Sequence, residues 1–215
     1  MNYTPLFLSL LLLLPFPAHS ETHEFTDTEG RKLKAEILEY GDGWINVKRT
    51  DGRKATLTFN KLSDADKTWF NEWLAAKEKD AAAKKRAIEV PAKIVSYCKE
   101  QKGKQVGNGE CWTLANECFK SCGLKRPGGQ LRVWGRKLET KEKPQPGDIV
   151  EFKAAKFSDG GMTGPEHTAV VVGLGKQKGI IQIAEQNWGG NKTVRIRDFD
   201  PAGLKSGEMM FYRPE

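Results

Sequence analysis

A run of 24 residues without glycine or proline, DKTWFNEWLAAKEKDAAAKKRAIE, spans residues 66–89 and divides the chain into two blocks of different pattern. It is rich in alanine, lysine and glutamate, which have high helix propensity. Ser63, with Asp66 three residues on, has the spacing of a capping box, and Pro91 is the expected stop. We therefore predict a helix and linker over residues 63–91.

The two ends of this predicted helix differ in polarity. Trp69, Phe70 and Trp73 form an apolar face near its start, which predicts packing against a neighbouring sheet. Beyond Leu74 the run is mostly charged, which indicates a spacer between two domains. Pro91 is accordingly the expected boundary between two domains.

Alternating apolar and polar residues before the helix predict β-strands. The period of two is visible in RKLKAEIL, WINVKRT and KATLTF, and glycine-containing turns separate these segments. We expect a small antiparallel sheet or barrel over residues 21–62.

Residues 23–73 resemble the SH3-like endocytic-adaptor homology domain. The likeness lies in TDTEGRKLKAEILEYGDGWINVKRTDGRKATLTFNKLSDADKTWF, with its closing LS-x-x-D pattern. The resemblance implies a small all-β SH3-like fold and, as a partner, a short peptide ligand for this domain.

The N-terminus has the pattern of a signal peptide. Its apolar run, Leu6 to Pro17, is too short to cross a hydrocarbon core of roughly 30 Å as a helix. Ala18 and Ser20 are small residues at the −3 and −1 positions of a cleavage site. We predict a signal peptide over residues 1–20, cleavage after Ser20, a secreted or periplasmic protein and no stable membrane span. An uncleaved anchor stays open, because MNYTP carries no lysine or arginine.

Export affects the interpretation of the four cysteines, because an oxidising compartment allows disulfides. With Cys111 set aside, Cys98, Cys118 and Cys122 remain. The last two lie four residues apart on one predicted helix, so both are expected to face Cys98 rather than bond each other. A bridge from Cys98 to one of them and free thiols are both open. The C-x3-C spacing lacks nearby histidines, so we expect no metal and no cofactor.

The net charge of +7 lies entirely in residues 92–215, because the preceding residues carry 14 acids and 14 bases. Such a domain is attracted to anionic polymers such as cell wall or nucleic acid, although the charge is equally compatible with a role in solubility alone. No basic motif interleaved with aromatics is present, and we therefore expect no nucleic-acid partner.

The C-terminal block begins with helical patterns, PAKIVSYCKE and a second one starting near Cys111. From Gly147 onward the pattern becomes strands: DIVEF, HTAVVVGL, GIIQIAEQN, TVRIRDF and EMMFYRP. Helices followed by an antiparallel sheet predict an α+β domain over residues 92–215.

Cys111 is the candidate nucleophile. It stands where the turn GNGE gives way to a helix, and a helix N-terminus lowers a thiol pKa because its free N–H groups favour the thiolate. His167 opens the strand HTAVVVGL and is a suitable general base. Either residue alone is more often structural; together they indicate a site.

Glu185 and Asn187 provide the third element. On a strand they share a face with Ile181 and Ile183, so two polar groups point to the apolar side and need partners. Glu185 accepting from His167 would orient the imidazole, as in a catalytic triad. The alternative is a structural network before the turn WGGN.

The order Cys, His, Glu, Asn, with PQPGDIVEF between the first two, resembles the CHAP domain, a relative of the NlpC-type cell-wall hydrolases with a papain-like fold. The resemblance covers residues 92–213 and implies that Cys111, His167, Glu185 and Asn187 line the cleft. It implies an amide hydrolase acting on peptidoglycan or a peptide. Trp112, directly after the cysteine, and GPE before the histidine depart from the usual CHAP pattern. Trp112 and Trp188 are candidates for the cleft wall or for core packing.

GNGECWTLANE, PGDIVEFK, EHTAVV and EQNWGG also resemble the cysteine-proteinase-fold domain at the C-terminus of some fungal actin-patch SH3 proteins. That likeness does not by itself imply peptidase activity. The sequence therefore predicts an exported thiol hydrolase with a Cys-His-Glu triad. The alternative is a non-catalytic peptide- or polymer-binding protein on the same scaffold.

Overall fold

The computed structural model describes residues 21–215, so the predicted signal peptide and its cleavage site at Ser20 lie outside the described residues. The chain forms two compact units. The N-terminal unit ends at Lys79 and the C-terminal unit begins at Asp80. Over the described range, no helix combines the length and the apolar character that crossing a bilayer requires.

The N-terminal unit is built on a four-stranded antiparallel sheet. Its strands follow chain order, β1-β2-β3-β4, and a short 3-10 helix, Phe59–Lys61, follows them. The bounds are β1 Thr22–Thr26, β2 Lys32–Gly41, β3 Trp44–Arg49 and β4 Lys54–Thr58. The three predicted strands are confirmed, and β1 is an additional strand. The expected alternation buries Ala35 and Ile37 on β2, and Ile45 and Val47 on β3.

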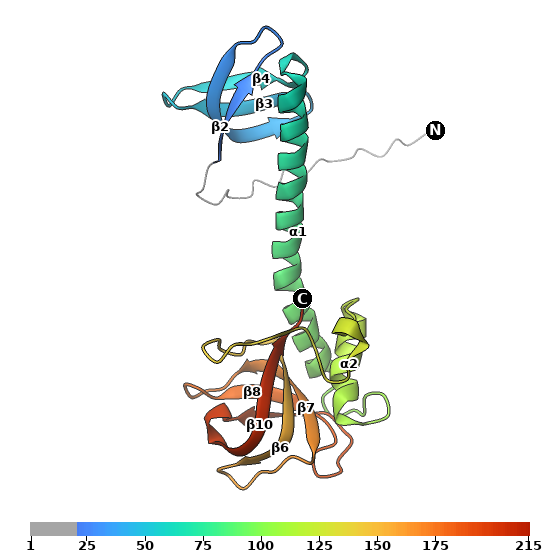
Figure 1. The fold of residues 1–215 in the computed structure, drawn as a ribbon. Coiled ribbons are helices and arrows are strands. Elements are labelled where there is room, and N and C mark those ends of the chain that lie inside the picture. Colours follow the sequence, from blue (N-terminus) through green and yellow to red (C-terminus); the bar gives the residue numbers. More distant parts are fainter. Residues whose placement is uncertain (1–20) are drawn as a thin grey trace, which may run out of the picture. The chain divides into compact units, whose positions relative to one another are not determined.

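Helix α1 (Asp64–Glu100) begins against this sheet (Figure 1). Phe70 is buried in the core of the N-terminal unit, and Trp69 and Trp73 pack against that core, as predicted. The capping residue is Ser63, whose Oγ accepts from the Asp66 backbone N–H at 3.2 Å. The Asp66 carboxylate accepts from the Thr26 N–H at 2.7 Å, which ties the helix start to β1.

The predicted helix end at Pro91 is wrong, because α1 continues through this proline to Glu100. Proline inside a helix removes one hydrogen bond and costs about 3 kcal/mol. The continuation buries Ile94 and Cys98 completely in the C-terminal core. Gly147 packs so closely on Pro91 that a Cβ there would lie 2.6 Å from it. Tertiary packing thus outweighs the local cost, and PAKIVSYCKE is the last part of α1 rather than a separate helix.

The C-terminal unit is an α+β structure, as predicted. Its six strands form one antiparallel sheet in the order β5-β10-β6-β7-β8-β9. Short 3-10 helices occupy Pro127–Gly129 and Pro201–Gly203. The bounds are α2 Cys111–Ser121, β5 Arg136–Lys137, β6 Ile149–Phe157, β7 Glu166–Leu174, β8 Ile181–Glu185, β9 Arg195–Phe199 and β10 Leu204–Arg213. The five predicted strands are β6 to β10.

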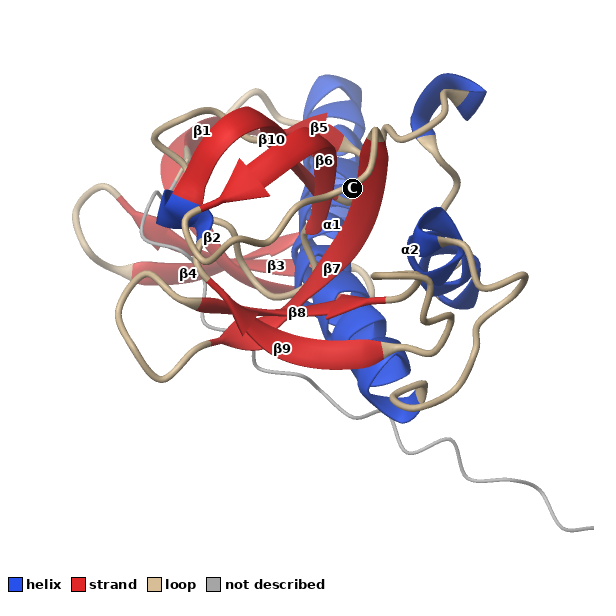
Figure 2. Cartoon of the chain, turned by 90° about the horizontal axis from the view of Figure 1, so that it is seen from below, coloured by secondary structure: helices blue, strands red, loops and turns tan. Residues whose placement is uncertain are grey.

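Helix α2 packs beside β7, as Figure 2 shows. Leu114 and Cys118 of α2 share a buried cluster with Val170 and Val172 of β7 and with Ile94 of α1. The opposite face of the sheet has its own apolar cluster, which includes Phe152, Val171, Ile183 and Phe199. The sheet is thus covered by apolar side chains on both faces, and the cluster that α2 shares with β7 holds the helix against that strand.

All four cysteines carry free thiols. Of the two pairings left open by the sequence, the structure brings Cys98 and Cys118 together, with their sulfur atoms 3.4 Å apart and both side chains fully buried. Cys122 is only partly buried, and its sulfur lies 4.0 Å from the Val90 carbonyl oxygen.

Candidate active site

Cys111 is the first residue of α2, where the sequence predicted it. The preceding turn uses glycine for its conformation: φ is 56° at Gly107 and 81° at Gly109. Glu110 is the N-cap residue with an extended backbone, and its side chain makes no cap hydrogen bond. The Thr113 N–H bonds to the Glu110 carbonyl oxygen at 3.0 Å, and the N–H groups that precede it at the start of the helix favour a negative charge on the thiol.

The structure brings Cys111, His167 and Glu185 together from α2, β7 and β8. The His167 Nε2 bonds to Glu185 Oε2 at 2.8 Å, and the Cys111 thiol lies close enough to the imidazole for each group to shift the pKa of the other. The exposed fractions are only 7%, 4% and 0%, so solvent competes little for these contacts.

The surroundings favour the charged forms of the thiol and the imidazole. Burial opposes a thiolate at Cys111, but the His167 hydrogen bond and the Thr168 backbone N–H outweigh it and lower its pKa. Burial likewise opposes an imidazolium, but the bonds and charges of Cys111 and Glu185 raise the pKa of His167 to about 9. Both shifts favour a thiolate–imidazolium pair over the neutral thiol and imidazole.

Two arginines on β9 hold Glu185 from the other side. Its Oε1 accepts from Arg195 Nε at 3.0 Å, Arg195 Nη2 at 2.7 Å and Arg197 Nε at 2.7 Å. Burial would raise the pKa of Glu185, but His167 and Arg197 lower it to about 2. Glu185 is therefore a fixed carboxylate anion, which is what orienting a cationic imidazole requires.

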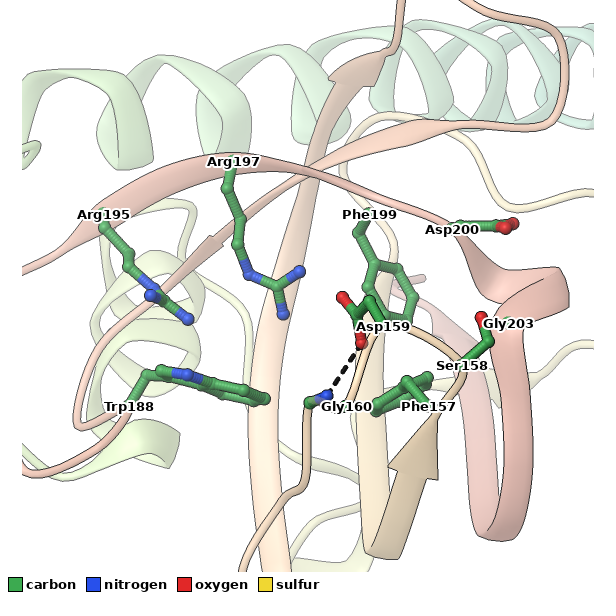
Figure 3. A pocket seen from close by; sticks show the side chains of 11 residues that line it. Phe157, Ser158, Asp159, Gly160, Trp188, Arg195, Arg197, Phe199, Asp200 and Gly203 are labelled. Atoms are coloured by element: carbon green, nitrogen blue, oxygen red, sulfur yellow. Dashed lines mark hydrogen bonds between the residues drawn. The ribbon is translucent and has the colours of Figure 1, made fainter.

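Trp188 lies against His167 in an edge-to-face contact, with ring centroids 5.3 Å apart. The guanidinium groups of Arg195 and Arg197 lie 4.9 and 5.0 Å from its ring centre. Trp188 and both arginines line a cavity of about 500 Å³, which also includes Phe157 and Phe199 (Figure 3). Trp188 thus stands in a cavity wall one contact away from the histidine.

Trp112, the second candidate for the cleft wall, packs against the core instead. It is partly buried against the cluster formed by α1, α2 and the sheet. Arg126 lies over its ring at 5.7 Å, and Trp112 is not among the residues that line the cavity near Trp188.

Asn187 joins the site at its rim rather than at the histidine. Strand β8 ends at Glu185, and Asn187 has a left-handed backbone with φ of 61°. Its amide nitrogen donates to Glu110 Oε2 at 3.0 Å. The expectation that Asn187 continues the inward face of the strand is wrong, because the chain turns away two residues too early.

Gln186, which the sequence patterns did not single out, is fully buried and fastens the loop before Cys111. Its amide nitrogen donates to the carbonyls of Val106 and Glu110 and to the Thr113 hydroxyl, at 2.6 to 3.0 Å. Its amide oxygen accepts from the Val106 N–H at 3.1 Å. This one side chain fixes the start of α2 against the end of β8.

A second buried carboxylate, Glu151, lies next to the triad and was also missed. Its Oε1 accepts from Trp134 Nε1 at 2.6 Å and from Thr168 Oγ1 at 2.7 Å. Burial raises the pKa of Glu151 despite these bonds. Arg132 approaches the other oxygen, with Nη1 3.7 Å from Oε2. The position of Glu151 opposite Thr168 on paired strands is the signal that could have found it.

Within residues 21–215, no group of three or more His, Cys, Asp or Glu side chains is arranged to hold a metal ion. The chemistry described so far uses the thiol, the imidazole and the carboxylates of the chain itself.

Known proteins are similar to both the sequence and the fold. The altered inheritance of mitochondria protein 3 of Debaryomyces hansenii is 28% identical in an alignment 146 residues long, which covers 56% of this chain and 15% of that protein. The chain thus spans only a small part of this relative's length.

Two solved structures are also similar. Ly7917 is 19% identical, with 58% of this chain and 62% of that chain covered and a TM-score of 0.41. An NlpC/P60 family protein from Bacillus cereus ATCC 10987 is 17% identical, with 89% and 60% covered and a TM-score of 0.36. Residues 84–215, which include the whole candidate site, match the family described as AIM3/BBC1 cysteine proteinase-fold domain. The chain belongs to this cysteine proteinase-fold family.

Proposed function

We propose that this protein is an exported thiol hydrolase that cleaves an amide bond. The observation that carries the proposal is the buried Cys111–His167–Glu185 relay at the start of α2. A nucleophile, a base and a group that orients the base are the parts that covalent amide hydrolysis needs.

In the proposed reaction the Cys111 thiolate attacks the amide carbonyl carbon, and a carbon–sulfur bond forms. The developing oxyanion is held by the free N–H groups at the start of α2. His167, as the imidazolium, gives its proton to the departing amine, and the carbon–nitrogen bond breaks. A water molecule then loses a proton to His167 and attacks the thioester carbon, the carbon–sulfur bond breaks, and the acid is released with the thiolate and the imidazolium restored.

The proposed substrate is peptidoglycan or another peptide. The resemblance to CHAP domains supports this class, as do the positive charge of residues 92–215 and the aromatic cavity beside His167. We further propose that the N-terminal sheet is an SH3-like module that binds a short peptide, and that residues 1–20 direct export. The four-stranded antiparallel sheet supports the proposal of an SH3-like module.

One observation favours the non-catalytic alternative. Cys111 and His167 are only 7% and 4% exposed, so little of either side chain is accessible to a substrate carbonyl. A binding protein on the same scaffold would keep the triad as a structural network.

Amide cleavage and thiol reactivity, measured on the chain of residues 21–215, test the proposal. The chain is incubated with peptidoglycan and with unrelated peptides, and Cys111→Ser is the matched control. In parallel, iodoacetamide labelling at graded pH is mapped by mass spectrometry, with Cys122, the more exposed thiol, as the internal reference.

Cleavage that disappears in Cys111→Ser, together with labelling of Cys111 below the ordinary thiol pKa of about 8.5, is the expected result. Labelling only above that pH with no amide cut would reject catalysis and leave the binding function. Early labelling without cleavage would show that the thiolate forms and that the substrate class is wrong.

A further inference from the structure

The cavity beside His167 lies along β9 and the turn that follows β6 (Figure 3). Arg195, Arg197 and Phe199 line it from alternate positions of the strand, which place them on one face. Trp188 forms the wall toward His167, with ring centroids 5.3 Å apart. The volume of about 500 Å³ is in the range of pockets that hold a small ligand. The proposed catalytic groups thus adjoin a space large enough for part of a substrate.

The two arginines of this wall carry more donors than Glu185 accepts. Glu185 Oε1 takes Arg195 Nε, Arg195 Nη2 and Arg197 Nε. Arg197 Nη1 makes one long contact, at 3.4 Å, with the Asp198 carbonyl oxygen. The described residues offer no acceptor to Arg195 Nη1 or Arg197 Nη2, and a guanidinium has five N–H groups. The two side chains are 40% and 26% exposed, so donors remain free for a ligand in this cavity.

The balance of charge favours an anion at this end of the cavity. Two guanidinium groups face the single carboxylate of Glu185, which leaves one positive charge without a partner. Both groups lie over the Trp188 ring, at 4.9 and 5.0 Å from its centre. Figure 3 shows both side chains extending from β9 toward this ring. The unpaired charge is therefore held against the wall that adjoins His167.

Two other carboxylates limit which anion fits. Asp159 and Asp200 also line the cavity, and their Oδ1 atoms accept the Gly161 and Ala202 N–H groups of their own turns. Asp200 follows the end of β9, roughly 16 Å along the chain from Arg195 at the usual rise of a strand. Their negative charges oppose a dianion more than a monoanion. A carboxylate also matches the planar fork of a guanidinium, so it fits this cavity better than a phosphate does.

Contact with His167 assigns the cavity to one side of the scissile bond. In the proposed reaction, His167 gives its proton to the departing amine, and the amine must therefore lie at this ring. Trp188 contacts the same ring and forms the cavity wall. The amine half of the substrate is thus the half nearest to the cavity.

We propose that this cavity binds a free carboxylate on the amine half of the substrate, held by Arg197 and Arg195. The inference rests on the proposed thiol hydrolase and narrows its substrates to amides whose departing amine carries a carboxylate, as an amino acid does. Arg197 is the main donor, because it gives one N–H to Glu185 whereas Arg195 gives two. Phe157 and Phe199 contact the apolar part of the same group.

Two matched ligands, N-acetylphenylalanine and its carboxamide, test the need for a carboxylate. They have the same body and differ in one negative charge. Binding to residues 21–215 is followed by NMR through the Trp188 indole N–H, at one pH and ionic strength. Phenyl phosphate, an aromatic dianion, is the third ligand.

Four variants locate the binding site. Arg197→Gln removes the proposed donor, and Arg197→Lys keeps its charge without the planar fork. Asp159→Asn removes a negative charge from the cavity and keeps an oxygen for the turn. The control is Arg136→Gln, because Arg136 is a half-exposed arginine of β5 that is paired with Glu142 and does not line the cavity.

We expect the unchanged chain to bind the carboxylate at least about tenfold more tightly than the carboxamide, as for one charged hydrogen bond. Arg197→Gln should abolish most of this preference, and Arg197→Lys should retain part of it. Asp159→Asn should strengthen carboxylate binding about threefold, and Arg136→Gln should change nothing. Equal affinities or no binding in the unchanged chain, tighter binding of phenyl phosphate, or an equal loss in Arg136→Gln would overturn the proposal.

The comparison of ligands on the unchanged chain decides the question even if Arg197→Gln fails to fold. A crystal structure of the N-acetylphenylalanine complex adds a direct measurement: the carboxylate should lie about 2.7–2.9 Å from a free Arg197 nitrogen. Failure of the proposed function is distinguishable. Carboxylate binding without any amide cleavage retains the site and rejects hydrolysis, whereas cleavage without a preference for the carboxylate does the reverse.

Discussion

Each unit of this protein contains a histidine paired with a buried carboxylate. In the N-terminal unit, His23 Nε2 lies 2.6 Å from Asp66 Oδ1. In the C-terminal unit, His167 Nε2 lies 2.8 Å from Glu185 Oε2. The two rings have different neighbours: the Cys111 thiol is close enough to His167 to affect its pKa, whereas His23 stacks on Trp69.

The His23 ring is enclosed by aromatic side chains. It stacks on Trp69 with centroids 3.5 Å apart and an interplanar angle of 7°, and Phe25 meets it edge-on. Its carboxylate, Asp66, is also the helix-capping partner of Ser63. The same kind of histidine–carboxylate pair thus fastens a helix start in one unit and lies beside a thiol of lowered pKa in the other.

His167→Asn should have the largest effect on the C-terminal pair. Without the imidazole, burial loses the largest of the effects that offset it, so the pKa of Cys111 rises and less thiolate forms. We expect amide cleavage to fall by about 10⁴-fold or more, measured as kcat/KM. The matched change His23→Asn should leave cleavage unchanged; an equal loss there would mean that fold damage, not chemistry, is being measured.

Glu185→Gln should have the next largest effect. A neutral amide cannot stabilise the imidazolium, so the pKa of His167 falls from about 9, and two arginines lose their buried counter-charge. We expect cleavage to fall by about a thousandfold and the pKa to fall measurably by NMR titration. Asp66→Asn is the counterpart in the other unit, and a comparable loss of activity from it would refute the division of roles.

The pH dependence of cleavage should report on the C-terminal pair without any substitution. Cleavage should rise as Cys111 ionises at a pH below the ordinary thiol range and fall as His167 loses its proton near pH 9. The sign follows from the raised pKa of His167: the imidazolium is retained below that pH and lost above it. A profile of kcat/KM against pH that keeps rising beyond pH 10 would show that the imidazolium is not the proton donor.

The smallest effect is expected from His23→Ala, which should destabilise only the N-terminal unit. The lost stacking and hydrogen bond predict a change of about 1–2 kcal/mol in its free energy of unfolding. Urea unfolding followed by tryptophan fluorescence measures it, with Lys48→Ala, at an exposed position of β3, as the control. No change in stability would mean that the Asp66–His23 contact is dispensable.

Much of the C-terminal site was predictable because each of its three central residues starts or ends a regular element. Cys111 follows a glycine turn, His167 opens a strand, and Glu185 points inward on a strand with a clear period. These local patterns fix which residues face the core, and little else is needed to bring them together.

The remaining parts depend on tertiary contacts that local patterns do not contain. Asn187 leaves the strand through a left-handed turn, and Gln186, on what should be the outer face, is buried by the loop before α2. Pro91 stays within α1 because of packing against Gly147. Arg195 and Arg197 did leave a signal, since an Arg-x-Arg pair on one strand puts two cations on one face.

The closeness of the Cys98 and Cys118 thiols affects how readily the protein is oxidised. With sulfur atoms 3.4 Å apart in a sealed core, they need little movement to couple, and exported proteins meet oxidants that cytosolic ones do not. Whether the pair is a dithiol or a disulfide should therefore depend on the oxidants that the protein meets. Intact mass of the natural protein, lower by two hydrogens after export, would show the history of each molecule.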